Sequence, residues 1–246
     1  MENVIQVIDI EKYYGYGGSL VKALDRVSFN VQKEEFTSIM GTSGSGKTSL
    51  LNIIATISTA TSGKVIFEGK DITSLDDCGK ADLRKNNIGF IFQDYNLIDT
   101  LTIKENICLP LIMCKHGKKE ISTRADKIME QMGIYNIKDR FPGQVSGGQQ
   151  QRCACARALV CGKGYLFADE PAGALDTRSS INLMETFKII NSKFHVTILM
   201  VTHDPVSSSF GNRVLFLENG KIVYELLRGN KTNEEMLREI LDIQRI

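Results

Sequence analysis

The chain has 246 residues, of which 42% are hydrophobic and 24% charged, and its 30 basic and 29 acidic residues leave a formal net charge of +1 at pH 7. This composition excludes disordered, collagen-like and coiled-coil proteins, and the length allows one large domain or two small ones. The near-zero net charge gives no support to a basic nucleic-acid-binding surface, so we expect no nucleic-acid partner.

The six cysteines form no C-x-x-C pair, and together with the three histidines they outline no zinc site. The first ten residues lack the basic and apolar segments of a secretory signal, so we interpret the cysteines as reduced cytosolic thiols. The longest apolar runs, at 107–114 and 196–201, are too short to span a bilayer. We therefore expect a soluble chain whose membrane role, if it has one, comes through a partner.

In the first third of the chain, runs of apolar and β-branched residues predict strands. A glycine-rich turn follows the third strand directly, and a helix is predicted after it, over 50–57. The predicted strands are 4–10, 27–31, 36–40, 65–67 and 88–92.

The middle of the chain, from about 94 to 160, is predicted to be mainly helical. Thr102 and Glu105 form a capping box that predicts a helix to about 114. A second helix is predicted over 122–132, with Gly133 as its C-terminal cap. A third helix begins at Ser146 and continues to about 160.

Strands alternate with helices again after residue 160. Asn219-Gly220 is a two-residue hairpin signal between two strands, and Asp176 or Thr177 caps a helix to about 191. Thr232 caps a last helix. The strands are predicted at 165–169, 196–201, 214–217 and 221–226. This alternation predicts an α/β core with a parallel sheet.

The glycine-rich turn matches the phosphate-binding motif G-x-x-x-x-G-K-[ST], and its position between a strand and a helix supports the match. Glycines let the backbone curl so that its N–H groups point inward, and the helix N-terminus adds partial positive charge. Lys47 would reach the β- and γ-phosphates of a nucleoside triphosphate, and Thr48 would coordinate Mg²⁺. The alternative is a turn that binds nothing. The loop and the residue after it are Gly41, Thr42, Ser43, Gly44, Ser45, Gly46, Lys47, Thr48 and Ser49.

Two acidic residues, Asp169 and Glu170, stand at the end of the apolar strand at 165–169. An aspartate delivered by a buried strand beside a phosphate loop holds Mg²⁺, directly or through water. Neighbouring side chains of an extended chain point to opposite faces, so Glu170 is a candidate general base for a water in line with the γ-phosphate. The alternative is a strand that simply ends at the surface.

Val145-Ser146-Gly147-Gly148-Gln149 precedes an alanine-rich helix and resembles the LSGGQ signature of ATP-binding-cassette (ABC) ATPases, with valine in place of the usual leucine. The phosphate loop, this signature, the acidic strand end and His203 follow in the family's order over nearly the whole chain. Ser146 also caps a helix whose first turn exposes backbone N–H groups, which is an anion-binding arrangement.

The resemblance implies an α/β fold with a P-loop NTPase (RecA-like) core, an antiparallel β subdomain and an inserted α-helical subdomain. The chain would be one nucleotide-binding domain over 1–246. Residues 1–93 and 161–228 would form the core with the β subdomain, 94–160 the helical subdomain, and 229–246 a C-terminal helix. ATP and Mg²⁺ would be bound by a homodimer, in which one protomer's Ser146, Gly147, Gly148 and Gln149 complete the other protomer's ATP site.

The same resemblance assigns roles to further residues. Gln93 looks like the Q-loop glutamine, which would coordinate Mg²⁺ together with Thr48 and Asp169. His203 looks like the switch histidine that contacts the γ-phosphate. Asp176 looks like the D-loop aspartate that touches the partner protomer, and it is also a candidate helix cap. The implied catalytic set is Glu170, His203, Gln93 and Lys47.

Adenine stacks in this family on an aromatic residue ahead of the second strand. Tyr13, Tyr14 and Tyr16 all lie in that stretch, and Tyr14, just before Gly15, aligns best. The alternative is a tyrosine that packs against the edge of a sheet.

Segments 36–47, 89–102 and 198–205 are similar to the Bce-type ATPases of peptide-antibiotic resistance and sensing, within the wider group of macrolide-export and lipoprotein-release ATPases. The similarity implies an integral-membrane permease as partner, docked largely on 94–114, and an indirect histidine-kinase partner. It implies bacitracin-like peptides as ligands and peripheral attachment to the cytoplasmic face of the plasma membrane. The alternatives are a macrolide-export or lipoprotein-release transporter, a soluble ABC ATPase, a P-loop GTPase and a non-catalytic sensing subunit.

Overall fold

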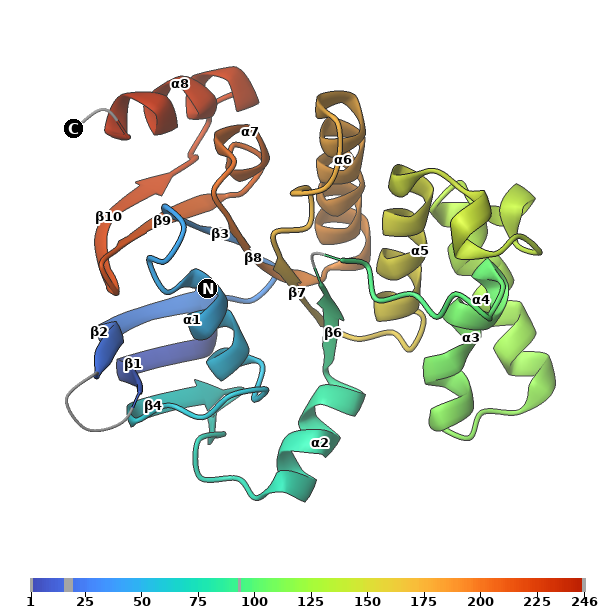
Figure 1. The fold of residues 1–246 in the computed structure, drawn as a ribbon, viewed down its shortest axis with the longest axis horizontal. Coiled ribbons are helices and arrows are strands. Elements are labelled where there is room, and N and C mark those ends of the chain that lie inside the picture. The colour runs from blue at the N-terminus through green and yellow to red at the C-terminus, as the bar shows by residue number, and fades with distance from the viewer. Residues whose placement is uncertain (1, 16–19, 93, 245–246) are drawn as a thin grey trace.

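The computed structural model describes residues 2–15, 20–92 and 94–244, and its centre is a six-stranded sheet (Figure 1). The strand order is β10-β9-β3-β8-β7-β6; β10 is antiparallel to β9, and the other neighbours are parallel. The strands are β3 (Phe36–Met40), β6 (Ile88–Ile91), β7 (Tyr165–Asp169), β8 (Thr197–Thr202), β9 (Arg213–Glu218) and β10 (Lys221–Leu227). The parallel α/β core predicted from the sequence is confirmed.

Hydrophobic cores lie on both faces of this sheet, which explains why its central strands are continuous apolar runs. In β7, Leu166 and Ala168 pack into a core shared with α6 (Thr177–Phe194). The alternate residues Tyr165 and Phe167 pack on the other face, with α1 (Lys47–Ile54).

A second, antiparallel sheet of order β2-β1-β4-β5 shares the core around α1. Its first two strands are longer than the sequence predicted, because irregular residues interrupt their alternation. Asp9 and Arg26 have φ angles of 46° and 53°, and the pairing register of the two strands shifts beside them. The strands are β1 (Asn3–Tyr14), β2 (Val21–Gln32), β4 (Ser62–Phe67) and β5 (Lys70–Asp71).

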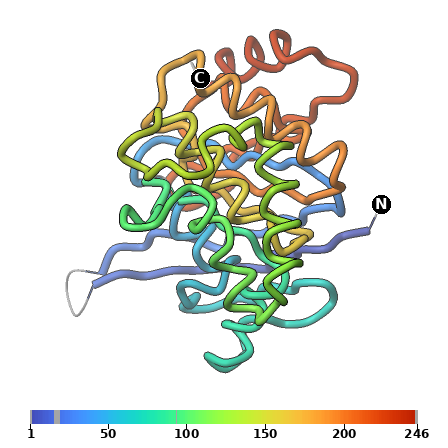
Figure 2. The backbone as a smooth tube through the Cα atoms, turned by 90° about the vertical axis from the view of Figure 1, so that its right-hand side faces the viewer, coloured from blue at the N-terminus to red at the C-terminus, as the bar shows by residue number. Residues whose placement is uncertain are grey.

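Three helices gather beyond the β6 edge of the main sheet, and they face the viewer in Figure 2. They are α3 (Ile103–Met113), α4 (Lys118–Gln131) and α5 (Gly147–Leu159), with short 3₁₀ turns at Tyr135–Ile137 and Pro142–Gln144. The capping boxes predicted at Thr102 and Ser146 are both present. Inside this group, the buried Asn106 side chain donates to the carbonyls of Ile98, Leu101 and Thr102, which closes the turn before α3.

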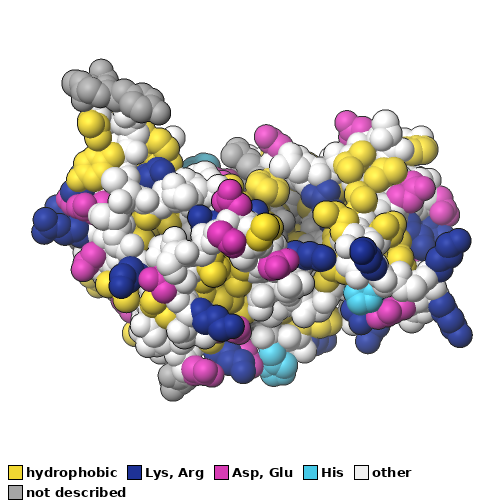
Figure 3. Space-filling view, turned by 90° about the horizontal axis from the view of Figure 1, so that it is seen from below, with side chains coloured by type: hydrophobic (Ala, Val, Ile, Leu, Met, Phe, Trp, Pro, Cys, Tyr) yellow, Lys and Arg dark blue, Asp and Glu magenta, His cyan; other side chains and the backbone are white. Residues whose placement is uncertain are grey.

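Two helices were not predicted, α2 (Asp77–Asn86) and the single-turn α7 (Pro205–Ser208). α2 has no buried residue. Its sequence therefore lacks the helical repeat of apolar residues from which a helix is predicted. The predicted last helix is α8 (Asn233–Ile243), capped by Thr232. In the described ranges, no helix is long and apolar enough to cross a bilayer. Figure 3 shows acidic and basic side chains interspersed over the lower face.

Candidate active site

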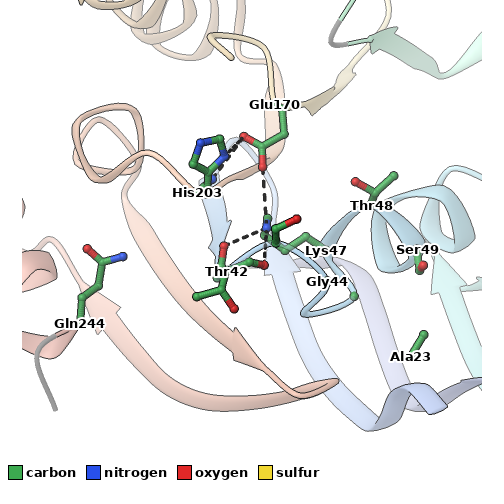
Figure 4. Close-up of a pocket in the computed structure, with 12 residues that line it drawn as sticks. Ala23, Thr42, Gly44, Lys47, Thr48, Ser49, Glu170, His203 and Gln244 are labelled. Carbon is green, nitrogen blue, oxygen red and sulfur yellow. Dashed lines mark hydrogen bonds and ion pairs between the residues drawn. The ribbon is translucent and has the colours of Figure 1, made fainter. Parts of the chain in front are cut away.

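A pocket of about 660 Å³ opens between the turn after β3 and the end of β7 (Figure 4). The turn leads into α1, so the first N–H groups of that helix face the pocket, and no side chain caps them. The residues that line the pocket are Ala23, Gly41, Thr42, Ser43, Gly44, Gly46, Lys47, Thr48, Ser49, Glu170, His203 and Gln244.

Gly46 is required in this loop by both its backbone angle and its neighbour. Its φ is +104°, and a Cβ there would lie 2.4 Å from the carbonyl oxygen of Ala23 in β2. A Cβ on Gly220, in the β9–β10 turn, would lie 2.8 Å from the same oxygen. The Gly220 N–H donates to the Ser45 carbonyl at 3.1 Å, and its carbonyl accepts from the Asp25 N–H at 2.9 Å. The hairpin turn therefore joins the loop to the antiparallel sheet.

Lys47 begins α1, and its side chain is only 6% exposed. Its ammonium donates to the carbonyls of Gly41 and Thr42 at 2.8 and 2.9 Å. The same nitrogen lies 3.7 Å from Oε1 of Glu170. A buried positive charge thus stands at the centre of the pocket, close to one carboxylate (Figure 4).

Asp169 ends β7, and its Oδ1 accepts a hydrogen bond of 2.9 Å from the Thr48 hydroxyl. Burial raises the pKa of Asp169 above its ordinary value, although the Thr48 hydrogen bond acts in the opposite direction. A carboxylate and a hydroxyl held together are hard oxygen donors of the kind that Mg²⁺ prefers. The pair therefore fits a magnesium ion.

Glu170 leaves the strand in a left-handed conformation, with φ of 46°. This angle turns its carboxylate toward His203, whose backbone N–H donates to Oε2 at 3.2 Å and whose Nδ1 lies 2.9 Å from the same oxygen. The Glu170 side chain is 13% exposed and that of His203 65%. A mostly buried carboxylate is thus held between Lys47 and an accessible imidazole. Sparse backbone conformations of this kind cluster at active sites.

The signature residues form the N-terminus of α5, away from this pocket in the same chain. The Ser146 hydroxyl accepts from the Gln149 N–H at 3.4 Å, and the Gln149 side chain accepts from the Ser146 N–H at 3.0 Å. Asp176 caps α6 and accepts from the Ser179 N–H at 3.0 Å, and the Ser179 bonds lower its pKa. Of the residues that the structure describes, none of Ser146, Gly147, Gly148, Gln149 or Asp176 lines the pocket.

Tyr14 lies at the end of β1, where its hydroxyl is 3.1 Å from the Ser49 hydroxyl beside the loop. The residue is 46% exposed, and the Lys12 ammonium lies 5.1 Å from the centroid of its ring. Tyr13 lies instead near the Lys22 ammonium, at 5.4 Å. Gln93 and Tyr16, both singled out in the sequence, lie outside the described residues.

Sequence reasoning did not identify two of the lining residues. Ala23 lies in β2 with its carbonyl against Gly46, and Gln244 caps the C-terminus of α8. Neither residue belongs to a motif or carries a chemical signal, so only the folded chain brings them to the pocket.

A family model described as "ABC transporter" matches residues 24–173, more than half of the chain. The chain belongs to the ABC transporter family. It is the ATP-binding and ATP-hydrolysing subunit of a membrane ABC transporter, and the resemblance drawn from its motifs is confirmed.

Other ABC proteins are similar to this chain over most of its length. The bacitracin export ATP-binding protein BceA of Halalkalibacterium halodurans is 42% identical over 98% of this chain and 95% of its own length. The macrolide export ATP-binding/permease protein MacB of Mannheimia succiniciproducens is 40% identical over 90% of this chain, which corresponds to 34% of that longer protein.

A solved ABC structure has the same fold. The dimeric post-hydrolysis structure of the ATP-binding cassette MJ0796 with ADP and Pi is 36% identical, with a TM-score of 0.83 over 91% of this chain and 98% of the other. This match confirms the predicted P-loop NTPase fold.

Proposed function

We propose that ATP is hydrolysed in the pocket around Lys47, with Glu170 as general base, in a transporter that confers resistance to peptide antibiotics or senses them. The observation that carries the catalytic part is the Glu170 carboxylate, held 3.7 Å from Lys47 and 2.9 Å from His203. A general base needs a fixed carboxylate beside the reacting phosphate, and these contacts fix it.

The loop binds the phosphates of ATP. Phosphate oxygens replace the Gly41 and Thr42 carbonyls as acceptors for the Lys47 ammonium, and the uncapped N–H groups of α1 complete the cradle. His203, more than half exposed beside Glu170, contacts the γ-phosphate, while Glu170 takes the proton from the attacking water.

Mg²⁺ fits beside the phosphates, where Thr48 and Asp169 would hold it together with Gln93. The ion would neutralise charge on the β- and γ-phosphate oxygens when it is bound. Asp169 has to be ionised for this role, and its elevated pKa makes it protonate at higher pH than an exposed aspartate.

Two copies of the chain form the complete site. Ser146, Gly147, Gly148 and Gln149 lie outside their own chain's pocket, so they are free to contact the nucleotide of a partner protomer. Asp176, at the exposed start of α6, would touch the same partner. Support comes from MJ0796, whose cassettes form a dimer with ADP and Pi.

Tyr14 stacks on adenine in this proposal. Its exposed ring adjoins Ser49, at the edge of the phosphate loop, whereas Tyr13 pairs with Lys22. The domain boundaries expected from the sequence, 1–93 with 161–228, 94–160 and 229–246, form part of the same proposal.

Peptide antibiotics are the proposed ligand class because BceA is similar over nearly the full length of both chains. An integral-membrane permease would be the partner and would place the chain at the cytoplasmic face of the plasma membrane, with a histidine kinase as an indirect partner. A macrolide exporter is a second candidate, favoured by the 40% identity to MacB.

The test of the catalytic role is Glu170→Gln, which keeps the size of the side chain and removes its basicity. We expect turnover to fall roughly 10²–10⁴-fold, the usual contribution of a general base, while ATP binding persists and ATP traps a dimer. Phosphate release measures the turnover, and the mass of the protein in the presence of ATP shows whether the dimer forms. Glu185→Gln, on the exposed surface of α6, is the matched control. Near-normal turnover in Glu170→Gln would remove Glu170 from the role of base.

A growth assay tests the ligand class. Cells that carry the chain with its permease should tolerate bacitracin, and this tolerance should disappear with Glu170→Gln. Tolerance of macrolides alone would favour the second candidate.

A further inference from the structure

Residues 94–97, here called the post-β6 segment, are tied to the signature helix α5 by Arg157. The guanidinium donates from Nη2 to the Tyr95 carbonyl at 2.8 Å and from Nη1 to the Asn96 carbonyl at 2.6 Å. Arg157 lies in the last turn of α5. Its planar fork holds two acceptors in a fixed geometry, which a lysine ammonium cannot reproduce.

The backbone that Arg157 holds is strained. Tyr95 and Asn96 have φ angles of 58° and 47°, in the left-handed region. Asparagine tolerates that region, but a bulky tyrosine adopts it only where the surrounding structure enforces it. The two bonds from Arg157 supply such enforcement, so the conformation of the segment depends on α5.

The tyrosine ring reaches the other end of the same helix. The Tyr95 hydroxyl lies 3.3 Å from the position that a Cβ on Gly147 would take. Gly147 is the first residue of α5, about 15 Å along the axis from Arg157 at 1.5 Å per residue. The long Arg157 side chain covers part of this distance and Tyr95 the rest, with its carbonyl bonded to the guanidinium and its hydroxyl against the signature glycine.

We propose that Tyr95 is a positioning residue for the signature end of α5. The role rests on the proposed function, in which the N–H groups of Gly147 and Gly148 face the partner protomer's ATP. Through Tyr95, the post-β6 segment and the signature move as one body, so a displacement of the segment changes where those N–H groups point. Neither Tyr95 nor Arg157 lines the phosphate pocket.

The test uses the full chain carrying Glu170→Gln, in which ATP-driven dimerisation is measured by sedimentation against ATP concentration. Adding Arg157→Lys should raise the ATP concentration for half-dimerisation by about fivefold or more, the effect of losing one of its two hydrogen bonds. Tyr95→Ala removes the side chain that contacts Gly147 and should raise this concentration as well. Nucleotide affinity of the monomer, measured at dilute protein, should stay unchanged. The matched control is Tyr135→Ala, another half-exposed tyrosine of the helical region, which should leave both quantities unchanged.

The outcomes distinguish a failure of the proposed shared ATP site from a failure of the proposed role of Tyr95. If Glu170→Gln alone fails to dimerise with ATP, the proposed shared site is wrong. If it dimerises, and Arg157→Lys and Tyr95→Ala dimerise at the same ATP concentration, the role of Tyr95 is wrong.

A second measurement compares one substitution in two backgrounds, so that a variant that folds poorly is not mistaken for support. Gly147→Ala places a methyl group against the Tyr95 hydroxyl, and Tyr95→Phe removes that hydroxyl. We expect Gly147→Ala to weaken ATP-driven dimerisation less in the Tyr95→Phe background than in the Glu170→Gln chain alone. Equal losses in the two backgrounds would contradict the contact between Tyr95 and the signature.

Discussion

The N-termini of α1 and α5 both carry glycines and both point their backbone N–H groups outward, yet they differ in what satisfies those groups. At α1, Gly46 offers no side-chain cap, and the buried Lys47 adds a positive charge. At α5, Ser146 and Gln149 already form a complete capping box. Unsatisfied N–H groups beside a cation favour an anion strongly. At α5 the box occupies the N–H groups of Ser146 and Gln149 and leaves those of Gly147 and Gly148 for an anion.

This difference implies an order of events. Under the proposed function, ATP would bind first at α1 of one chain, because that terminus has no side-chain cap and lies beside the buried Lys47. The α5 terminus of a second chain would then close over the bound nucleotide. Substitutions at the two termini should therefore separate binding by one chain from association of two.

Lys47→Ala should have the largest effect. It removes the buried ammonium that faces the phosphates, and hydrogen bonds to charged groups contribute about 1.5–3 kcal/mol each, so ATP affinity should fall roughly 100-fold or more. Titration calorimetry on the single chain measures the loss. The exposed Lys70→Ala in β5 is the control. Unchanged affinity in Lys47→Ala would remove the loop from nucleotide binding.

Ser146→Ala should have an intermediate effect, confined to association. The loss of an N-cap costs about 1 kcal/mol, so ATP-driven dimerisation should weaken about five- to tenfold while single-chain ATP affinity stays the same. Thr102→Ala removes an equivalent capping box from α3 and serves as the matched control. If both variants weaken the dimer equally, the effect comes from helix stability and not from the signature.

Asp169→Asn should have the smallest of the three effects. It should slightly raise the thermal stability of the chain without nucleotide. Burial raises the pKa of Asp169, so its charged form destabilises the folded chain above the folded-state pKa, and the penalty vanishes below the ordinary aspartate pKa. The amide avoids this penalty. At neutral pH without nucleotide we therefore expect Tm to rise.

The gain from Asp169→Asn should shrink as the pH falls toward the ordinary pKa of an aspartate, while Mg²⁺-dependent turnover is lost at every pH. Scanning calorimetry from pH 3 to 8 follows the first effect, and phosphate release the second. A lower Tm at neutral pH would mean that the carboxylate stabilises the fold instead.

Local patterns in the sequence predicted most of this architecture. The boundaries of β3 and β7 and the caps at Thr102, Ser146 and Thr232 depend on neighbouring residues, and the structure has them where predicted. The phosphate loop could be predicted for the same reason, since its chemistry lies within eight consecutive residues.

The remaining features depend on contacts between distant residues. Arg157 meets Tyr95 across 62 residues of sequence, and the Ala23 carbonyl meets Gly46 only because β2 lies beneath the loop. The irregular pairing of β1 and β2 hid the true length of both strands. No local pattern encodes such contacts.

The β9–β10 turn at Asn219 and Gly220 has a consequence for protein engineering. Short hairpin turns near a surface are ordinarily chosen for inserting tags or reporter peptides, because added residues there seldom disturb a fold. Here both backbone polar groups of Gly220 are occupied, one by Ser45 and one by Asp25. An insertion would separate the loop from the sheet beneath it, so a tag belongs elsewhere, for example at the exposed Gly117 before α4.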